Sequence, residues 1–248
     1  KNEGYSENIS LAVSEHYLPR FNKDELPSTK YGSITSISDK FETIISLFIS
    51  GKRPSGSSDP YALRRNLNGI IQIAWNFNFD IKFDVLVSDS LDYWKENINE
   101  TSFNYEDVSN EILEFIKQRV LSYLEEISIK KDIINSIYNS KLIQKSKLLE
   151  IYDLKNRIST INNIKSNENH FSIINIISRY SKLAVKGNLD TNIYFSENII
   201  KPNLFEKNSE NEVLNLIKKI EILISKSNWR YDELIDLFVN HQSILNDL

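Results

Sequence analysis

The sequence predicts an all-α protein, and three observations lead to this fold class. Gly and Pro are sparse, with six and five in 248 residues, which favours long helices over a β-rich fold with many turns. Apolar residues recur at steps of three and four through most of the chain. In the second half, one such segment follows another with short connections, which is typical of an antiparallel helical bundle.

The composition limits the class of protein. Hydrophobic residues make up 40% and charged residues 26%, as in soluble globular proteins. The absence of Cys excludes disulfides and thiolate metal sites and fits a reducing, cytoplasmic location. No apolar run approaches the roughly 20 residues that span a bilayer, so we expect no membrane segment. The chain contains no Met and starts at Lys1, which indicates a piece of a longer protein.

The formal net charge of −4 argues against a general basic surface for nucleic acid. Any contact with RNA would therefore depend on local cationic patches in an acidic protein.

The first elements are a short helix over residues 6–18, a loop between two prolines, and a long amphipathic helix. Apolar residues mark one face of the long helix: Ile34, Ile37, Phe41, Ile44 and Phe48. Gly51 is suited to end it in a left-handed conformation. The other face is small and polar, with Asp39, Thr43, Ser46 and Ser50. Such a face either packs closely against a neighbour or lines a site.

The stretch GKRPSGSSDPYALRR (51–65) combines a helix start with four cations. Asp59 is a good N-cap and Pro60 a good first helical residue. The apolar stripe that follows is Leu63, Leu67, Ile70 and Ala74. A nucleotide-binding P-loop is excluded, because Ser57 stands where that loop requires lysine and no hydrophobic strand precedes it.

The rest of the chain reads as a connector followed by helices. We place a domain boundary near residues 95–105, after a helical or mixed connector over 80–105. Further helices are predicted over residues 106–128, 130–140, 141–165, 168–186, 209–226 and 230–247. The first of these has Ile112, Phe115, Ile116, Val120 and Leu124 on one side.

The residues that carry chemistry in enzymes form no recognisable active site here. His16, His170 and His241 are far apart and lack metal-ligand spacing. No Ser/His/Asp or Glu/His pairing is visible, and the carboxylates are typical of solvated helix faces. We therefore expect no catalytic residue, no bound cofactor and no metal in this chain.

Several segments resemble the bacterial glycyl-tRNA synthetase β-subunit family. These are EGYSENISLAVSEHYLPRFNKDELP (3–27), SISDKFETIISLFISGKRPSGSSDPYALRR (36–65) and NGIIQI (68–73). The Asp-Pro-aromatic-Ala-Leu-Arg-Arg run is the most characteristic. ILEFIKQRV (112–120) and IISRYSKLA (176–184) extend a weaker resemblance over residues 105–248.

The resemblance implies a fold and a role. Residues 1–98 would be the C-terminal part of an HD-like helical domain, and residues 99–248 a helical anticodon-binding domain that lacks its last helices. The family implies a heterotetrameric ligase whose separate α subunit attaches glycine to tRNA-Gly with ATP and Mg²⁺, while the β subunit recognises the tRNA.

The resemblance also suggests site residues. Asp39 in SDKFET matches the last metal ligand of HD domains, and the other ligands would lie upstream of Lys1, so a complete site is not expected. The tRNA contacts suggested by the stretch 51–65 are Lys52, Arg53, Arg64 and Arg65; those in the bundle are Arg119, Arg157, Arg179 and Lys182. Arg suits phosphate because its guanidinium donates two parallel hydrogen bonds.

Three alternatives remain open at this point. Arg64 or Arg65 could instead pair with local carboxylates and fix the turn. The chain could be part of an HD-type phosphohydrolase, or a scaffold that only docks the α subunit.

Overall fold

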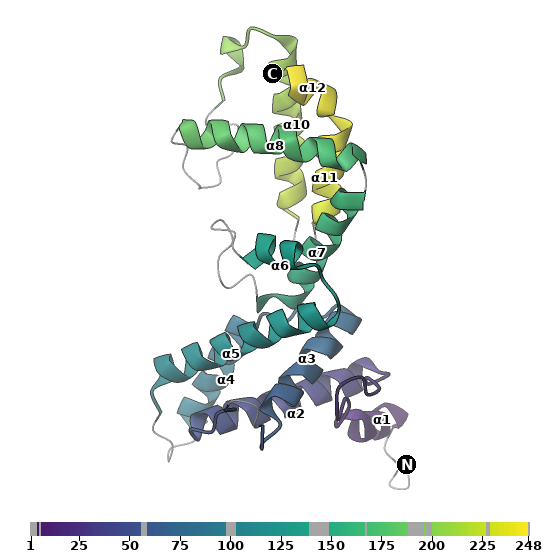
Figure 1. Cartoon of the computed structure of the whole chain (residues 1–248), viewed down its shortest axis with the longest axis vertical. Coiled ribbons are helices and arrows are strands. Elements are labelled where there is room, and N and C mark those ends of the chain that lie inside the picture. The colour runs from purple at the N-terminus through teal and green to yellow at the C-terminus, as the bar shows by residue number, and fades with distance from the viewer. Residues whose placement is uncertain are drawn as a thin grey trace. The chain divides into compact units, whose positions relative to one another are not determined.

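The computed structural model describes residues 4, 6–55, 59–97, 103–138, 149–166, 168–187, 196, 200–226 and 229–247. Within these ranges the chain forms eleven α-helices and no extended strand, so the all-α prediction is confirmed (Figure 1). Residues 56–58 of the Gly-Ser-rich turn and the beginning of the helix predicted from residue 141 lie outside the described residues.

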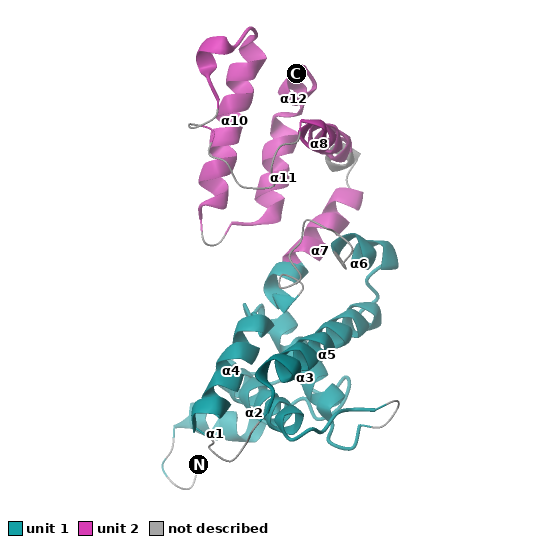
Figure 2. Cartoon of the chain, turned by 90° about the vertical axis from the view of Figure 1, so that its left-hand side faces the viewer, with its two compact units in different colours: residues 1–155 teal, residues 156–248 magenta. Residues whose placement is uncertain are grey.

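The chain divides into two compact units, residues 1–155 and 156–248 (Figure 2). The boundary expected at 98/99 falls inside the first unit, because α5 (Tyr105–Glu126) packs against α2, α3 and α4. The assignment of an HD-like and an anticodon-binding domain stays a prediction.

The first unit contains the helices predicted for the N-terminal half. They are α1 (Glu7–Glu15), α2 (Lys30–Ile49), α3 (Leu63–Phe77), α4 (Phe83–Asn97), α5, and α6 (Lys131–Tyr138). Helix α7 (Ile151–Ser166) runs across the boundary between the two units. The core of the first unit is built from the apolar faces of α2, α3, α4 and α5.

The apolar stripe predicted for α2 is buried only in the second half of the helix. Phe41, Ile44 and Phe48 are buried, but Ile34 is 56% exposed, so its prediction as a core residue is wrong. The reason is that small residues, Gly32 among them, face inward in the first turns of α2, where the end of α1 packs closely against it.

The start of α3 also differs from the prediction. The helix begins at Leu63 and not at Pro60, because Ala62 has a positive φ of 57° that interrupts the helical path. The N-cap residue is therefore Ala62 and not Asp59 as predicted. The Asp59 side chain still binds the first amides of the helix: its Oδ1 accepts from the Leu63 N–H at 2.8 Å, and its Oδ2 from the Arg64 N–H at 3.1 Å. The predicted stripe from Leu63 to Ala74 is buried, and Gly51 after α2 has a φ of 75° as expected.

The second unit is smaller and contains α8 (Glu168–Lys186), α10 (Asn208–Ile224), α11 (Tyr231–Asn240) and α12 (Gln242–Asp247). Helices α10 and α11 run side by side, and α8 lies across them (Figure 1). A small apolar cluster holds these helices together: Ile173, Ile176, Leu216 and Leu245. The single helix predicted over 230–247 is interrupted at His241, whose φ of −116° is not helical.

Candidate nucleic-acid interface

An open pocket of about 550 Å³ lies between the segment after α2, the start of α3, and α5. Arg53, Arg64 and Arg119 line it, and we call it the arginine pocket. Its other lining residues are Phe48, Pro54, Asn110, Glu111, Glu114, Phe115, Gln118 and Ser122. Arg53 and Arg64, from the stretch 51–65, therefore line the same pocket as Arg119, which the sequence analysis assigned to a different domain.

Arg53 is held on one wall of the pocket. Its Nη1 donates to the Phe48 carbonyl oxygen at 2.5 Å and to the Lys52 carbonyl oxygen at 3.1 Å. Its guanidinium carbon lies 4.4 Å from the centroid of the buried Phe48 ring. Its Nε donates to Glu111 Oε2 at 2.5 Å, and its Nη2 forms an ion pair with the same oxygen. The guanidinium is therefore oriented by the last turn of α2 and by one carboxylate of α5.

Arg119 is half-buried on the α5 wall, where its Nε donates to Asn68 Oδ1 at 3.0 Å. Burial lowers the pKa of Arg119, and so does the positive charge of Arg64, while Glu126 and Asp59 act in the opposite direction. An arginine remains protonated in proteins, so the two guanidinium groups repel each other in a partly desolvated place. Such an arrangement favours a bound anion.

Both signs of charge are present at this pocket. Glu111 pairs with Arg53, and Glu114 Oε2 lies 3.3 Å from Lys117 Nζ. Lys52 and Arg65 do not line the pocket but are exposed in the segments beside it. The Lys52 Nζ lies 6.0 Å from the centroid of the Tyr61 ring.

The sequence analysis missed the uncharged polar side chains of the pocket, Asn110, Gln118 and Ser122. They recur at steps of four and eight along α5, on the same face as Arg119. That spacing was a signal that could have identified them.

The cations predicted in the bundle have different surroundings. Arg157 is only 8% exposed. Arg179 and Lys182 lie one turn apart on α8, and both are exposed. The Nη2 of Arg179 donates to the Leu245 carbonyl oxygen at 2.6 Å, near the end of α12. The role of these three residues in tRNA binding stays a prediction.

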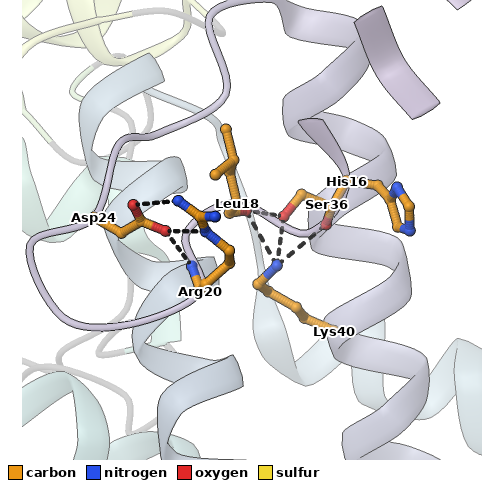
Figure 3. Close-up of polar contacts among 6 residues, drawn as sticks. All are labelled: His16, Leu18, Arg20, Asp24, Ser36 and Lys40. Atoms are coloured by element: carbon orange, nitrogen blue, oxygen red, sulfur yellow. Dashed lines mark hydrogen bonds and ion pairs between the residues drawn. The ribbon is translucent and has the colours of Figure 1, made fainter. Parts of the chain in front are cut away.

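A second group of polar residues, beside α2, is satisfied within the protein. Figure 3 shows Lys40, which is 4% exposed and donates from Nζ to the carbonyl oxygens of His16 at 3.2 Å and Leu18 at 3.1 Å, and to Ser36 Oγ at 2.9 Å. Ser36 Oγ in turn donates to the Leu18 carbonyl oxygen at 2.5 Å. Burial lowers the pKa of Lys40, and the charge of Asp39 opposes this.

The same region contains a buried carboxylate. Glu15 is 7% exposed and accepts hydrogen bonds from the N–H and hydroxyl groups of Ser28 and Thr29, the residues just before α2. Burial raises the pKa of Glu15, but these hydrogen bonds outweigh it, and the pKa lies below its usual value. In the loop after α1, Arg20 Nε donates to Asp24 Oδ2 at 2.9 Å (Figure 3).

Two glycines allow this close packing. A Cβ on Gly32 of α2 would lie 2.0 Å from Glu15 Oε2, and one on Gly69 of α3 would lie 3.2 Å from Lys40 Cε and Pro19 Cγ. We call the group Glu15, Leu18, Gly32, Ser36, Lys40 and Gly69 the interlock. Glu15 binds Ser28 and Thr29, and Lys40 and Ser36 bind each other and the backbone of residues 16 and 18, so these polar groups join α1 and the loop after it to α2. Gly69 lets α3 pack closely against the Lys40 side chain.

The interlock changes the interpretation of the SDKFET segment. Lys40 of that segment is buried, whereas Asp39 is exposed and its carbonyl oxygen accepts from Thr43 Oγ at 2.9 Å. Within the described ranges, no three His, Cys, Asp or Glu side chains are grouped so that they could hold a metal ion. Nor does any helix in those ranges have the length and apolarity needed to cross a membrane.

Comparison with known proteins places the chain in a family. Residues 1–139, more than half of the chain, match the family model for the glycyl-tRNA synthetase beta subunit. The chain belongs to this family. The matched residues include both the interlock and the arginine pocket, and the resemblance inferred from the sequence is confirmed.

Individual relatives agree with the family match. The chain is 34% identical over 211 residues to the glycine–tRNA ligase beta subunit of Gloeothece citriformis, covering 84% of this chain and 29% of that protein. It is 32% identical over 204 residues to that of Acaryochloris marina, covering 82% and 28%. With that of Clostridioides difficile it shares 29% identity over 247 residues, covering 99% and 33%. The chain thus spans about a third of the length of these curated relatives.

Proposed function

We propose that this chain is a tRNA-recognition part of the β subunit of a glycine–tRNA ligase. In this role it positions tRNA-Gly while the α subunit attaches glycine with ATP and Mg²⁺. The observation that carries the proposal is the arginine pocket: three arginines from three segments of the first unit line one open cavity in a chain whose net charge is negative.

The chemistry of the pocket suits an RNA backbone. Guanidinium groups donate two parallel hydrogen bonds to phosphate oxygens, and they lose less solvation than an ammonium group does. Lys52 and Arg65 are exposed beside the pocket and extend the cationic area. Since the rest of the protein is acidic, binding concentrated at this place would favour one orientation of the tRNA over non-specific contact.

Docking of the α subunit is a second candidate function, and an apolar pocket of the second unit favours it. This pocket has a volume of about 410 Å³ and is lined mostly by apolar side chains of α8 and α10, with Phe238 and Leu245. On the same α8, Leu183 is 55% and Val185 is 73% exposed. A pull-down of the α subunit that survives RNase treatment would support this function.

The experiment that tests tRNA recognition compares binding of tRNA-Gly and a non-cognate tRNA to the purified chain at about 0.15 M salt, the physiological range. In the variant Arg64→Ala/Arg65→Ala we expect about ten-fold weaker binding of tRNA-Gly, and a slope of log affinity against log salt that is smaller by about 1 to 2. The capping hydrogen bond of the Arg64 N–H to Asp59 does not depend on the side chain and is retained.

The matched control is Lys130→Ala/Lys131→Ala, which removes the same charge from an exposed site at the start of α6. We expect this variant to bind within about two-fold of the wild type, as isolated surface charges contribute little. Equal weakening by both double variants would show a general charge effect, and unchanged binding by Arg64→Ala/Arg65→Ala would argue against the proposed contact.

A further inference from the structure

We propose that Glu111 gates the arginine pocket: its carboxylate occupies Arg53 in the free protein and is displaced by a backbone phosphate of the bound tRNA. This inference rests on the proposed function, because it assigns the pocket to the tRNA backbone. It adds a specific competitor within the protein and a residue whose removal strengthens binding.

The ion pair between Arg53 and Glu111 is exposed and easily broken. Glu111 lies on the solvent side of α5, with 51% of its side chain exposed. A single oxygen, Oε2, receives both the Nε and the Nη2 of Arg53. Exposed ion pairs are weak, because water solvates both charges and the side chains lose freedom on pairing. An anion that offers more contacts can therefore replace this carboxylate at low cost.

Arg53 remains in place when the pair opens. Its Nη1 is bound to the carbonyl oxygens of Phe48 and Lys52, and its guanidinium lies over the Phe48 ring. Only the edge formed by Nε and Nη2 is released. This edge carries two parallel N–H groups and matches two oxygens of a phosphate. The donor is thus oriented before the ligand arrives, and little conformational entropy is lost on binding.

A phosphate in the pocket lies near more arginines than the Glu111 carboxylate does. Glu111 contacts Arg53, whereas an anion inside the cavity also lies beside Arg64 and Arg119, which line it. Arg119 is held at its Nε by Asn68, so its remaining N–H groups are the ones available to a ligand. Asn110, Gln118 and Ser122 provide uncharged donors and acceptors for a ribose next to the phosphate.

The gate would act wherever small anions compete with tRNA for the pocket. A free anion that reaches only one or two cations must compete with Glu111 for Arg53 and is repelled by its charge. Displacing Glu111 costs each ligand the same free energy. A small anion that is bound weakly therefore loses most of its occupancy, whereas a tRNA that makes further contacts outside the pocket stays bound.

The test compares Glu111→Gln with the matched control Glu125→Gln. Glu125 is an exposed carboxylate of the same helix, α5, and does not line the pocket. We expect Glu111→Gln to bind tRNA-Gly about five-fold more tightly, the effect of losing one exposed competing ion pair. Binding by Glu125→Gln should stay within about two-fold of the wild type. Glu111→Ala should change binding in the same direction as Glu111→Gln, and urea unfolding checks that each variant is folded.

A second probe, inorganic tripolyphosphate measured by calorimetry, separates the gate from the proposed function. If the wild type binds tRNA but Glu111→Gln binds it equally or more weakly, the gate is refuted and the proposed function stands. If the wild type binds no tRNA, the proposed function is refuted, and binding of tripolyphosphate then tests the gate by itself. Tighter binding of tripolyphosphate by Glu111→Gln then supports the gate, and equal or weaker binding refutes it.

Discussion

Charged side chains lie beside α2 at two places, and their partners differ. In the interlock, the Lys40 ammonium and the Glu15 carboxylate are almost fully buried, and hydroxyl and backbone groups of neighbouring segments surround them. In the arginine pocket, beyond the last turn of α2, guanidinium groups from three segments face an open cavity. The first arrangement uses its polar groups to hold helices together, whereas the second places its charges around a cavity that is open to a ligand.

This difference shows how to interpret the segments that mark the family. The runs EHYLPRF (15–21) and SDKFET (38–43), which lie within the family segments 3–27 and 36–65, contribute Glu15 and Lys40 to the interlock. Packing explains these two residues. The run 59–65 contributes Asp59, whose side chain binds the first amides of α3, and Arg64, which faces the pocket. A characteristic motif can therefore be structural at one position and available for binding at another.

The largest effect is expected from Gly32→Ala in the interlock. Alanine normally stabilises a helix relative to glycine, but here its Cβ would lie 2.0 Å from Glu15 Oε2. The buried carboxylate would have to move away from Ser28 and Thr29, and we expect a loss of about 3 kcal/mol in the free energy of unfolding. Urea unfolding measures this loss.

Gly51→Ala is the control for that experiment. Gly51 has a φ of 75°, and a Cβ there would meet no atom within 4 Å. Only the left-handed backbone conformation is penalised, at about 1 kcal/mol. If Gly32→Ala were no more destabilising than Gly51→Ala, the close packing of α1 against α2 would be refuted.

The next effect concerns the buried charge of the interlock. Lys40→Met keeps an unbranched side chain, one atom shorter, but removes three hydrogen bonds, and we expect a loss of about 2 kcal/mol at neutral pH. The lowered pKa adds a second expectation, because the folded protein binds the Lys40 proton less tightly than the unfolded chain does. As pH rises from the folded pKa towards the ordinary value of 10.5, the wild type should gain stability relative to Lys40→Met.

Parallel pH curves for the two proteins would contradict that expectation and would show an ordinary pKa for Lys40. Lys130→Met, at an exposed lysine, should change the free energy of unfolding by no more than about 0.5 kcal/mol.

The smallest stability effect is expected in the arginine pocket. Arg119→Gln removes a charge that burial and Arg64 disfavour, so we expect the free energy of unfolding to change by less than about 0.5 kcal/mol in either direction. Binding of tRNA-Gly should weaken about ten-fold, since a charged hydrogen bond to phosphate is lost. Titration with tRNA and urea unfolding on the same samples measure both quantities, with Arg230→Gln, exposed and paired with Asp232, as control. Strong destabilisation with unchanged tRNA binding would make the pocket a structural element like the interlock.

The helices and most of their apolar faces were predictable from the sequence, since burial of an apolar stripe follows directly from a repeat of three and four residues. Leu63, Leu67, Ile70 and Ala74 are an example. The beginning of α3 was not predictable from the sequence, because it depends on a left-handed backbone at Ala62, a conformation that alanine rarely adopts.

The polar parts were harder to predict because their partners are distant in sequence. Lys40 binds the carbonyl oxygens of residues 16 and 18, and no pattern of side chains reveals which backbone groups a lysine will reach. Arg119 meets Arg64 only because α5 packs against α3. Four cations in residues 52–65 indicated the location of the candidate site, but the pocket itself is a product of tertiary packing.

The interlock also determines how α1 can open. This helix has nine residues, and Ile9 and Val13 are largely exposed, so little apolar burial holds its first turns. Its last residue, Glu15, is bound to the segment that begins α2, and the carbonyl oxygen of the next residue, His16, binds Lys40. Backbone amides in the first turn of α1 should therefore exchange their hydrogens through local fraying, whereas the N–H groups of Ser28 and Thr29 should exchange only when the helices of the first unit separate. The beginning of α1 and its end thus belong to different cooperative units, although they are only two turns apart.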